Sequence, residues 1–174
     1  MKKFKLLALI VLVIGFTTTF SSCGSDDSDP TPQEEDQYTV TVDNTILNDG
    51  DTWVTQATGE EGNMKLSIKN VSDEVIYLKI KVTDMSDNVP AQNDIELCLG
   101  ECYFSIAQNA IYPTGTPYSL QPGQTSPDGA AHIKNNDNRN GDIILSFKLF
   151  QTDAQGNELT NKKTVSFTYK YQAP

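Results

Sequence analysis

Histidine is nearly absent from this sequence, whose 174 residues include only His132. A hydrolytic triad needs a nucleophile held beside its histidine, and no Gly-x-Ser-x-Gly motif marks a serine for that role. A lone histidine on a short strand is usually a surface residue or one whose hydrogen bonds are satisfied. The sequence therefore names no catalytic residue, and we expect a protein that is not an enzyme.

Basic residues are also few. The chain has 13 lysines and arginines against 23 acids, which gives a formal net charge of −10. This charge repels nucleic acid and anionic headgroups, and no basic patch or basic–aromatic stripe offsets it. We therefore expect no nucleic-acid partner.

Acidic residues leave one enzymatic alternative open. A glycosidase uses two carboxyl groups about 5 to 10 Å apart in a cleft. Asp94, Glu96 and Glu101 lie close enough in the sequence to be considered. A compact domain of this size rarely offers a deep cleft, so we expect these acids to be solvated charges at its rim.

No apolar run reaches the length of about 20 residues that a membrane-spanning helix needs. The longest run, residues 6–16, follows a lysine-rich start and precedes small residues and Cys23. These features are typical of a cleaved export signal. The segment resembles a bacterial lipobox, with Phe20 in place of the more usual leucine. The resemblance implies that residues 1–22 are a lipoprotein signal peptide and that Cys23 receives a diacylglycerol; an ordinary signal peptide and an uncleaved anchor are the alternatives.

Residues 23–37 have the composition of a tether. The stretch after the cysteine is rich in acids and contains two prolines but no large apolar side chain, so it predicts a flexible linker. Its first part resembles the acidic surface-export signal of Bacteroidetes lipoproteins, carried here by Ser25, Asp26, Asp27, Ser28 and Asp29. The resemblance implies a protein anchored on the outer face of the outer membrane, with the periplasmic face as the alternative.

Signal cleavage would also change the charge of the chain. It removes three lysines and no acid, which takes the formal net charge from −10 to −13. Contact with the outer-membrane lipid should therefore come from the acylated Cys23 alone.

Helical periodicity is absent over any three turns, and alternation of apolar and polar residues takes its place. The clearest alternation covers residues 38–42, 64–69, 76–82, 143–149 and 165–171. Shorter strand candidates are residues 52–55, 95–99, 102–106 and 130–133. Turn residues separate these runs. The pattern predicts an all-β fold, an antiparallel β-sandwich of about 7 to 9 strands over residues 38–174.

Two segments resemble a known domain class. Met64 to Thr83 resembles the paired B and C strands of immunoglobulin-like modules in bacterial envelope proteins. Leu97 to Tyr103, followed by the Pro122-Gly123 turn, resembles a domain found in many secreted Bacteroidetes proteins. The resemblance implies an immunoglobulin-like sandwich, and it does not identify a ligand because such sandwiches have many functions.

The two remaining cysteines, Cys98 and Cys102, predict a disulfide, because the chain is exported and Gly100 between them allows a tight turn. A bridge over so short a loop stabilises the fold by only about 2 kcal/mol in the chain-entropy model. A metal site would need more ligands than the sequence places nearby, and redox pairs are usually Cys-x2-Cys at a helix start. We expect no metal and no cofactor.

Two loops have further candidate roles. Residues 136–142 resemble the start of a calcium loop, but Asn136 is a poor first ligand and Phe147 stands where a glutamate is required. Residues 109–129 contain four prolines with Tyr112 and Tyr118, which with Tyr103 could form a binding edge for a sugar or a protein. The alternative is a proline-stiffened connection whose tyrosines cover the core.

The sequence as a whole favours a non-catalytic, lipid-anchored interaction module whose ligand is a protein or a glycan. The alternative is a structural subunit of an envelope or surface assembly, and a small hydrolase using acidic residues is a third hypothesis.

Antibody labelling of intact and permeabilised cells tests the predicted location. We expect intact cells to be labelled, and we expect Cys23→Ala to abolish that labelling because it removes the lipid attachment site. Labelling that requires permeabilisation would contradict the surface-export signal assigned to Ser25–Asp29 and would favour the periplasmic face.

Overall fold

The computed structural model describes residues 37–137 and 141–174. The predicted signal peptide (1–22), Cys23 and the export signal Ser25–Asp29 lie outside the described residues, as does the linker apart from Gln37. Residues 138–140 of the calcium-like loop also lie outside them. Within the described ranges, no helix has the length and apolar character needed to cross a membrane.

The described part of the chain folds into twelve β-strands. They are β1 (Tyr38–Val42), β2 (Thr45–Ile46), β3 (Asp51–Thr55), β4 (Asn63–Asn70), β5 (Ile76–Met85), β6 (Ile95–Leu99), β7 (Glu101–Phe104), β8 (Ile111–Tyr112), β9 (Tyr118–Leu120), β10 (Ala131–Asn135), β11 (Ile143–Thr152) and β12 (Thr164–Tyr171).

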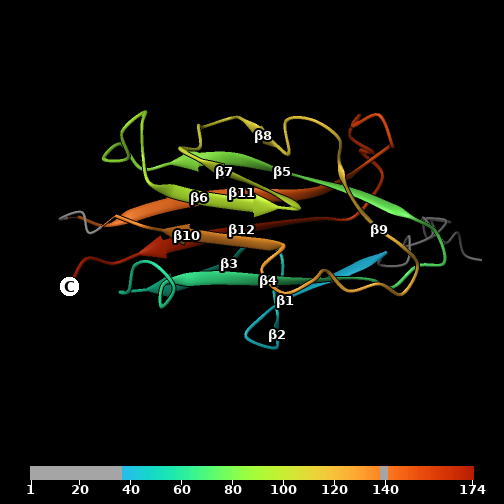
Figure 1. Ribbon diagram of the computed structural model, residues 1–174, viewed down its shortest axis with the longest axis horizontal. Coiled ribbons are helices and arrows are strands. Elements are labelled where there is room, and N and C mark those ends of the chain that lie inside the picture. The colour runs from blue at the N-terminus through green and yellow to red at the C-terminus, as the bar shows by residue number, and fades with distance from the viewer. Residues whose placement is uncertain (1–36, 138–140) are drawn as a thin grey trace, which may run out of the picture. The chain divides into compact units, whose positions relative to one another are not determined.

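These strands form two sheets (Figure 1). The first sheet has the order β2-β1-β4-β10-β6-β7, and the second has the order β3-β12-β11-β5-β8, with β9 also pairing with β5. The segments β1-β4-β10-β6 and β5-β11-β12 match the A-B-E-D and C-F-G orders of immunoglobulin domains. The predicted immunoglobulin-like β-sandwich is confirmed, with one addition: β3 pairs with β12 in parallel.

Alternation along the strands builds the core. In β12 every second residue from Val165 to Tyr171 is buried, and β4 shows the same pattern from Met64. The largest fully buried side chains include Tyr38, Met64 and Phe147. The Phe147 and Phe167 rings, from neighbouring strands, stack with centroids 5.5 Å apart. Burial of these apolar faces against each other holds the two sheets together.

Each of the nine strand segments predicted from the sequence overlaps a strand of the structure, and the three remaining strands are two or three residues long. These short strands are β2, β8 and β9. Strand β8 and strand β9 both pair with β5 from within the proline-rich segment. These segments are too short to show alternation in the sequence, and they form strands because they pair with a longer neighbouring strand.

The turn between β4 and β5 carries the chain from one sheet to the other. The two strands that the sequence presents as a pair therefore belong to different sheets. Asn70 is fully buried at this crossing, and its Nδ2 donates to the carbonyls of Glu74 at 2.7 Å and Leu120 at 3.0 Å. Its Oδ1 accepts from the Ser72 amide at 2.9 Å. One amide side chain thus fixes the turn and the start of the loop after β9.

The tip of the β6–β7 hairpin requires glycine for two reasons. Gly100 has a φ of +75°, a left-handed conformation that disfavours residues with a Cβ. A Cβ on Gly100 would also lie 2.6 Å from Cδ2 of Tyr118. The Tyr118 ring therefore packs directly on the hairpin backbone.

Gly100→Ala should destabilise the domain more than Gly123→Ala. Gly123 has a similar φ of +72°, but a Cβ added there would meet no atom within 4 Å. Gly123→Ala therefore measures only the cost of holding alanine in a left-handed conformation, about 1 to 2 kcal/mol. Displacing Tyr118 should add about 1 to 3 kcal/mol at Gly100. Urea unfolding of both variants measures the difference, and equal losses would show that the Tyr118 contact contributes nothing.

Candidate functional site

Two rows of side chains, polar except for Phe104, cross the outer face of the first sheet. The strand register sets the rows: Cys102, Cys98, His132 and Lys65 lie in one, and Phe104, Glu96, Lys134 and Asn63 lie in the other. The intervening residues Leu97 and Ile133 are fully buried on the opposite, core-facing side. Because side chains alternate between the faces of a sheet, both rows point away from the core.

Cys98 and Cys102 are directly opposite each other in the hairpin and form a disulfide, which confirms that prediction. Cys98 is buried, with 1% of its surface exposed, whereas Cys102 is exposed. The bridge therefore has one sheltered sulfur and one open to solvent.

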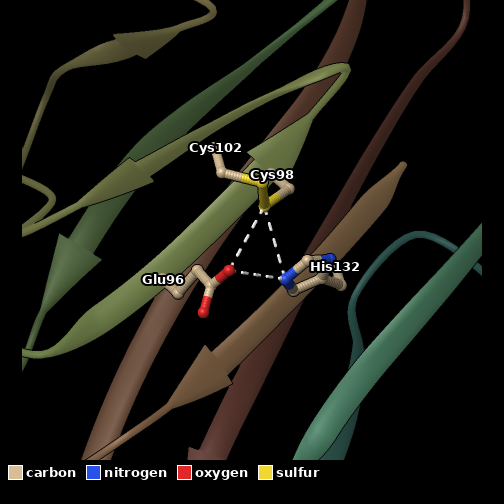
Figure 2. A group of neighbouring side chains, drawn as sticks. All are labelled: Glu96, Cys98, Cys102 and His132. Atoms are coloured by element: carbon tan, nitrogen blue, oxygen red, sulfur yellow. Dashed lines mark hydrogen bonds and ion pairs between the residues drawn. A yellow bond between two sulfur atoms is a disulfide. The ribbon is translucent and has the colours of Figure 1, made fainter. Parts of the chain in front are cut away.

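The side chains of His132 and Glu96 lie next to the buried sulfur, Sγ of Cys98 (Figure 2). Nε2 of His132 lies 3.3 Å from Sγ of Cys98 and 3.3 Å from Oε1 of Glu96. The ligand atoms of Glu96, Cys98, Cys102 and His132 all lie within 4.8 Å of one another. The sequence reasoning found too few ligands near the cysteines because His132 is 34 residues from Cys98 and only strand pairing brings them together.

The hydrogens on the His132 ring follow from its partners. Nδ1 lies 2.9 Å from the Gly129 carbonyl, which only accepts, so Nδ1 is a donor. A disulfide sulfur carries no hydrogen, so the 3.7 Å contact between Cys98 and Glu96 is not a hydrogen bond.

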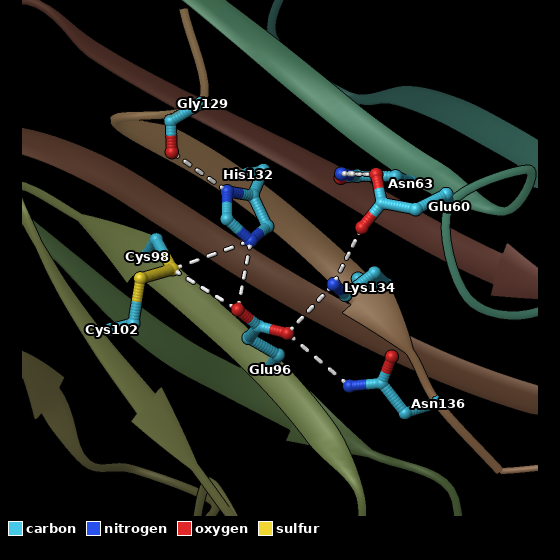
Figure 3. A network of polar contacts seen from close by, with 9 residues as sticks. All are labelled: Glu60, Asn63, Glu96, Cys98, Cys102, Gly129, His132, Lys134 and Asn136. Carbon is cyan, nitrogen blue, oxygen red and sulfur yellow. Dashed lines mark hydrogen bonds and ion pairs between the residues drawn. A yellow bond between two sulfur atoms is a disulfide. The ribbon is translucent and has the colours of Figure 1, made fainter.

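One cation and one amide donor hold the second carboxylate oxygen of Glu96 (Figure 3). Nζ of Lys134 lies 2.9 Å from Oε2 of Glu96 and 2.9 Å from Oε1 of Glu60. Nδ2 of Asn136 donates to the same Glu96 oxygen at 3.3 Å. Burial opposes ionisation, but the hydrogen bonds from Lys134, Asn136 and His132 outweigh it and lower the pKa of Glu96. The hydrogen bonds to Glu60 and to Glu96 raise the pKa of Lys134.

This charge network weakens the glycosidase alternative. The general acid of a glycosidase needs a raised pKa, and the shift at Glu96 is in the opposite direction. Glu101 accepts a hydrogen bond from the Tyr103 hydroxyl at 2.7 Å, and Asp94 is an exposed residue just before β6. Of the three acids that the sequence suggested, Glu96 and Glu101 are therefore each engaged by neighbouring side chains.

The three tyrosines of the predicted binding edge pack against the core. Tyr112 is buried, its hydroxyl accepts from the Ala107 amide at 3.1 Å, and its ring lies 4.7 Å from that of Tyr103. Tyr103 and Tyr118 are partly buried against the same core. Burial raises the pKa of Tyr118. Their positions match the alternative in which the tyrosines cover the core.

Phe104, like Lys134 and Glu60, is a site residue that the sequence reasoning did not single out. Its side chain is 66% exposed, the largest exposure among the large apolar residues of the described chain. It lies on β7, the last strand of its sheet, directly opposite Glu96. In a strand over residues 102–106, Phe104 and Tyr103 point to opposite faces of the sheet. This alternation was the signal in the sequence that one of the two aromatic side chains would face solvent.

The described ends of the calcium-like loop have protein partners. Asn136 donates to Glu96, and Oδ1 of Asp142 accepts from the Ala173 amide at 3.1 Å. Calcium binding by residues 136–142 stays untested, since 138–140 are not described.

Comparison with known proteins adds distant structural likenesses. No protein-family model and no curated protein matches the chain. The N-terminal domain of PorA is 24% identical, with a TM-score of 0.46, over 78% of this chain and 97% of that one. The PapD-like domain 7 of human CEP192 is 15% identical, with a TM-score of 0.43, over 88% and 98%. The class 5 fimbriae chaperone CfaA is 10% identical, with a TM-score of 0.41, over 77% and 56%.

Removal of the Lys134 ammonium should destabilise the domain more than removal of a comparable exposed lysine. Lys134→Met leaves Glu96 partly buried without its cation, which we expect to cost about 1 to 3 kcal/mol at neutral pH. Lys148→Met breaks a 2.6 Å pair with Glu158 whose side chains are 32% and 37% exposed, and should cost under about 1 kcal/mol.

The loss of stability caused by Lys134→Met should also depend on pH. The folded pKa of Glu96 lies below its ordinary value of 4.5, so its ionised form stabilises the fold above pH 4.5. This stabilisation is lost as the pH falls through the folded pKa, and the gap between wild type and Lys134→Met should narrow there. Denaturant unfolding of both proteins, at pH values from neutral to below 4.5, measures the difference in their free energies of unfolding. A difference that does not change with pH would contradict the pairing of Lys134 with Glu96.

Proposed function

We propose that this protein is a non-catalytic, lipid-anchored interaction module of the cell envelope, which binds a protein partner at the β6–β7 edge of its first sheet. The observation that supports the binding role is the exposed Phe104 side chain on the edge strand β7. The anchor rests on the sequence alone, on the export signal of residues 1–22 and the lipobox cysteine Cys23.

The β7 edge has features that suit a protein partner. As the last strand of its sheet, β7 has no ladder partner on its outer side among the described strands, so its backbone groups there can pair with another strand. An aromatic side chain next to charged groups is the composition of a typical interface, with an apolar centre and a polar rim. Phe104 would be the apolar anchor, with Glu96 and Lys134 beside it.

The disulfide stiffens this edge. It joins β7 to β6 two residues before Phe104, which reduces the ordering cost when the strand is bound. A protein partner is favoured over a glycan because the tyrosines that would stack on sugars are buried or partly buried.

A structural subunit of a surface assembly is the second candidate. Ile46 is 60% exposed on β2, which is the opposite edge strand of the same sheet. Apolar residues at both edges of one sheet would allow modules to join edge to edge.

Site-specific photo-crosslinking in living cells tests the proposal. A photoreactive phenylalanine analogue at position 104 should give a covalent adduct of defined mass with a protein partner. The same analogue at Val71, which is 46% exposed on the turn after β4, serves as the matched control. When the photoreactive group is placed at Glu101 instead, Phe104→Ser should abolish the adduct, because it removes the apolar anchor.

The adduct also separates the two candidates. A product whose mass equals two copies of this chain would support the assembly subunit, and a heterologous product would support the interaction module. Absence of any adduct at position 104, or equal adducts at 104 and 71, would refute binding at the β7 edge.

A further inference from the structure

We propose that reduction of the Cys98–Cys102 disulfide converts the outer face of β6, β7 and β10 into a site for one divalent cation of the zinc type. The ligands would be the two cysteine sulfurs, Nε2 of His132 and Oε1 of Glu96 (Figure 2). The argument for this site does not rest on the proposed partner at Phe104.

The geometry suits a four-coordinate ion. Zinc binds sulfur at about 2.3 Å and nitrogen or oxygen at about 2.0 to 2.2 Å, so tetrahedral ligand atoms lie roughly 3.3 to 3.8 Å from each other. The contacts among Cys98, His132 and Glu96 are 3.3, 3.3 and 3.7 Å. The fourth atom, Sγ of Cys102, lies within the same 4.8 Å cluster. The two sulfurs are bonded to each other in this structure. After reduction they would separate to about 3.8 Å by side-chain rotation, while His132 and Glu96 keep their positions.

The donor set is selective as well. Two thiolates, one imidazole and one carboxylate form a mixed sulfur, nitrogen and oxygen set that suits zinc and disfavours calcium or magnesium, which prefer oxygen alone. The cross-strand pairs Cys98–Cys102 and Cys98–His132 hold three of the ligands on adjacent paired strands.

Outer hydrogen bonds already orient the ligands (Figure 3). Nδ1 of His132 donates to the Gly129 carbonyl, which directs Nε2 into the cluster. Lys134 and Asn136 both bind Oε2 of Glu96, so Oε1 is the oxygen directed toward the cysteines. Support of this kind is a regular feature of metal sites, and here it holds His132 and Glu96 in place whichever redox state the sulfurs have.

Three of the four ligand residues are largely buried, and the fourth is open to solvent. The side chains of His132 and Glu96 are 9% and 12% exposed, and Cys98 is 1% exposed. Cys102 is exposed and gives both the ion and a reductant access from solvent.

The redox step has a simple balance. A dithiol reductant supplies two electrons and two protons to the Cys98–Cys102 bond, and its own two thiols become a disulfide. The two cysteine thiols then lose their protons when the ion binds them as thiolates. In the oxidised state the sulfurs are bonded to each other and supply no anionic ligand, so binding depends on reduction.

Metal titration of the full-length chain tests this site. The chain carries Cys23→Ser in every arm, so that only Cys98 and Cys102 supply thiols, and it is purified in detergent. Zinc affinity is measured by competition with a chromogenic chelator, before and after reduction by a phosphine that binds metals weakly. We expect one zinc per reduced chain and at least about tenfold weaker binding by the oxidised chain. Cobalt should give sulfur-to-metal charge-transfer absorption only after reduction.

Matched variants assign the ligands. Glu96→Gln and His132→Gln should each weaken zinc binding by the reduced chain more than about tenfold, as loss of a direct ligand requires. Glu101→Gln removes a neighbouring carboxylate that is outside the cluster and should leave the affinity unchanged. Circular dichroism of each reduced variant checks that the sheets persist.

Two results would overturn the proposal. One is a reduced chain that binds zinc no more tightly than the oxidised chain, whether or not it keeps its fold. The other is an affinity that Glu96→Gln and His132→Gln change no more than Glu101→Gln does, which would assign the binding to dispersed surface acids.

Discussion

The antiparallel register between β6 and β10 is the constraint on which the rest of this structure depends. It pairs Leu97 with Ile133 on the core face and Cys98 with His132 on the outer face. Because side chains alternate with a period of two, a slip of one residue would expose the apolar pair and bury the polar one. The burial of the core face therefore also fixes which side chains meet on the outer face.

The outer face is held together by charge and by a covalent bond. Lys134 lies between Glu60 and Glu96, and the Glu96 carboxylate in turn contacts His132. Little of the Lys134 and Glu96 side chains is exposed, so each charge depends on its partner for the hydrogen bonds that water would otherwise supply. The result is a rigid platform rather than a set of independent surface charges.

That platform ends at an edge strand. Strand β7 is joined to β6 through the hairpin at Gly100 and through the disulfide, and it presents Phe104 next to Glu96. A pre-ordered edge with one exposed aromatic residue loses less conformational entropy on binding than a mobile loop would. The buried position of Tyr112, by contrast, shows how an aromatic-rich and proline-rich loop can serve the core instead of a ligand.

The sequence by itself determined the fold class and the long strands, because alternation such as that of Val165 to Tyr171 records which face is buried. It also determined the disulfide, since Cys98 and Cys102 are local. Only the tertiary structure decided that His132 lies beside Cys98, that Tyr112 is buried and Phe104 exposed, and that the short strand β8 forms. The physical reason is the separation of the interacting residues along the sequence. Local alternation encodes which face of a strand is buried, whereas the packing of the whole sandwich sets which strand lies beside it.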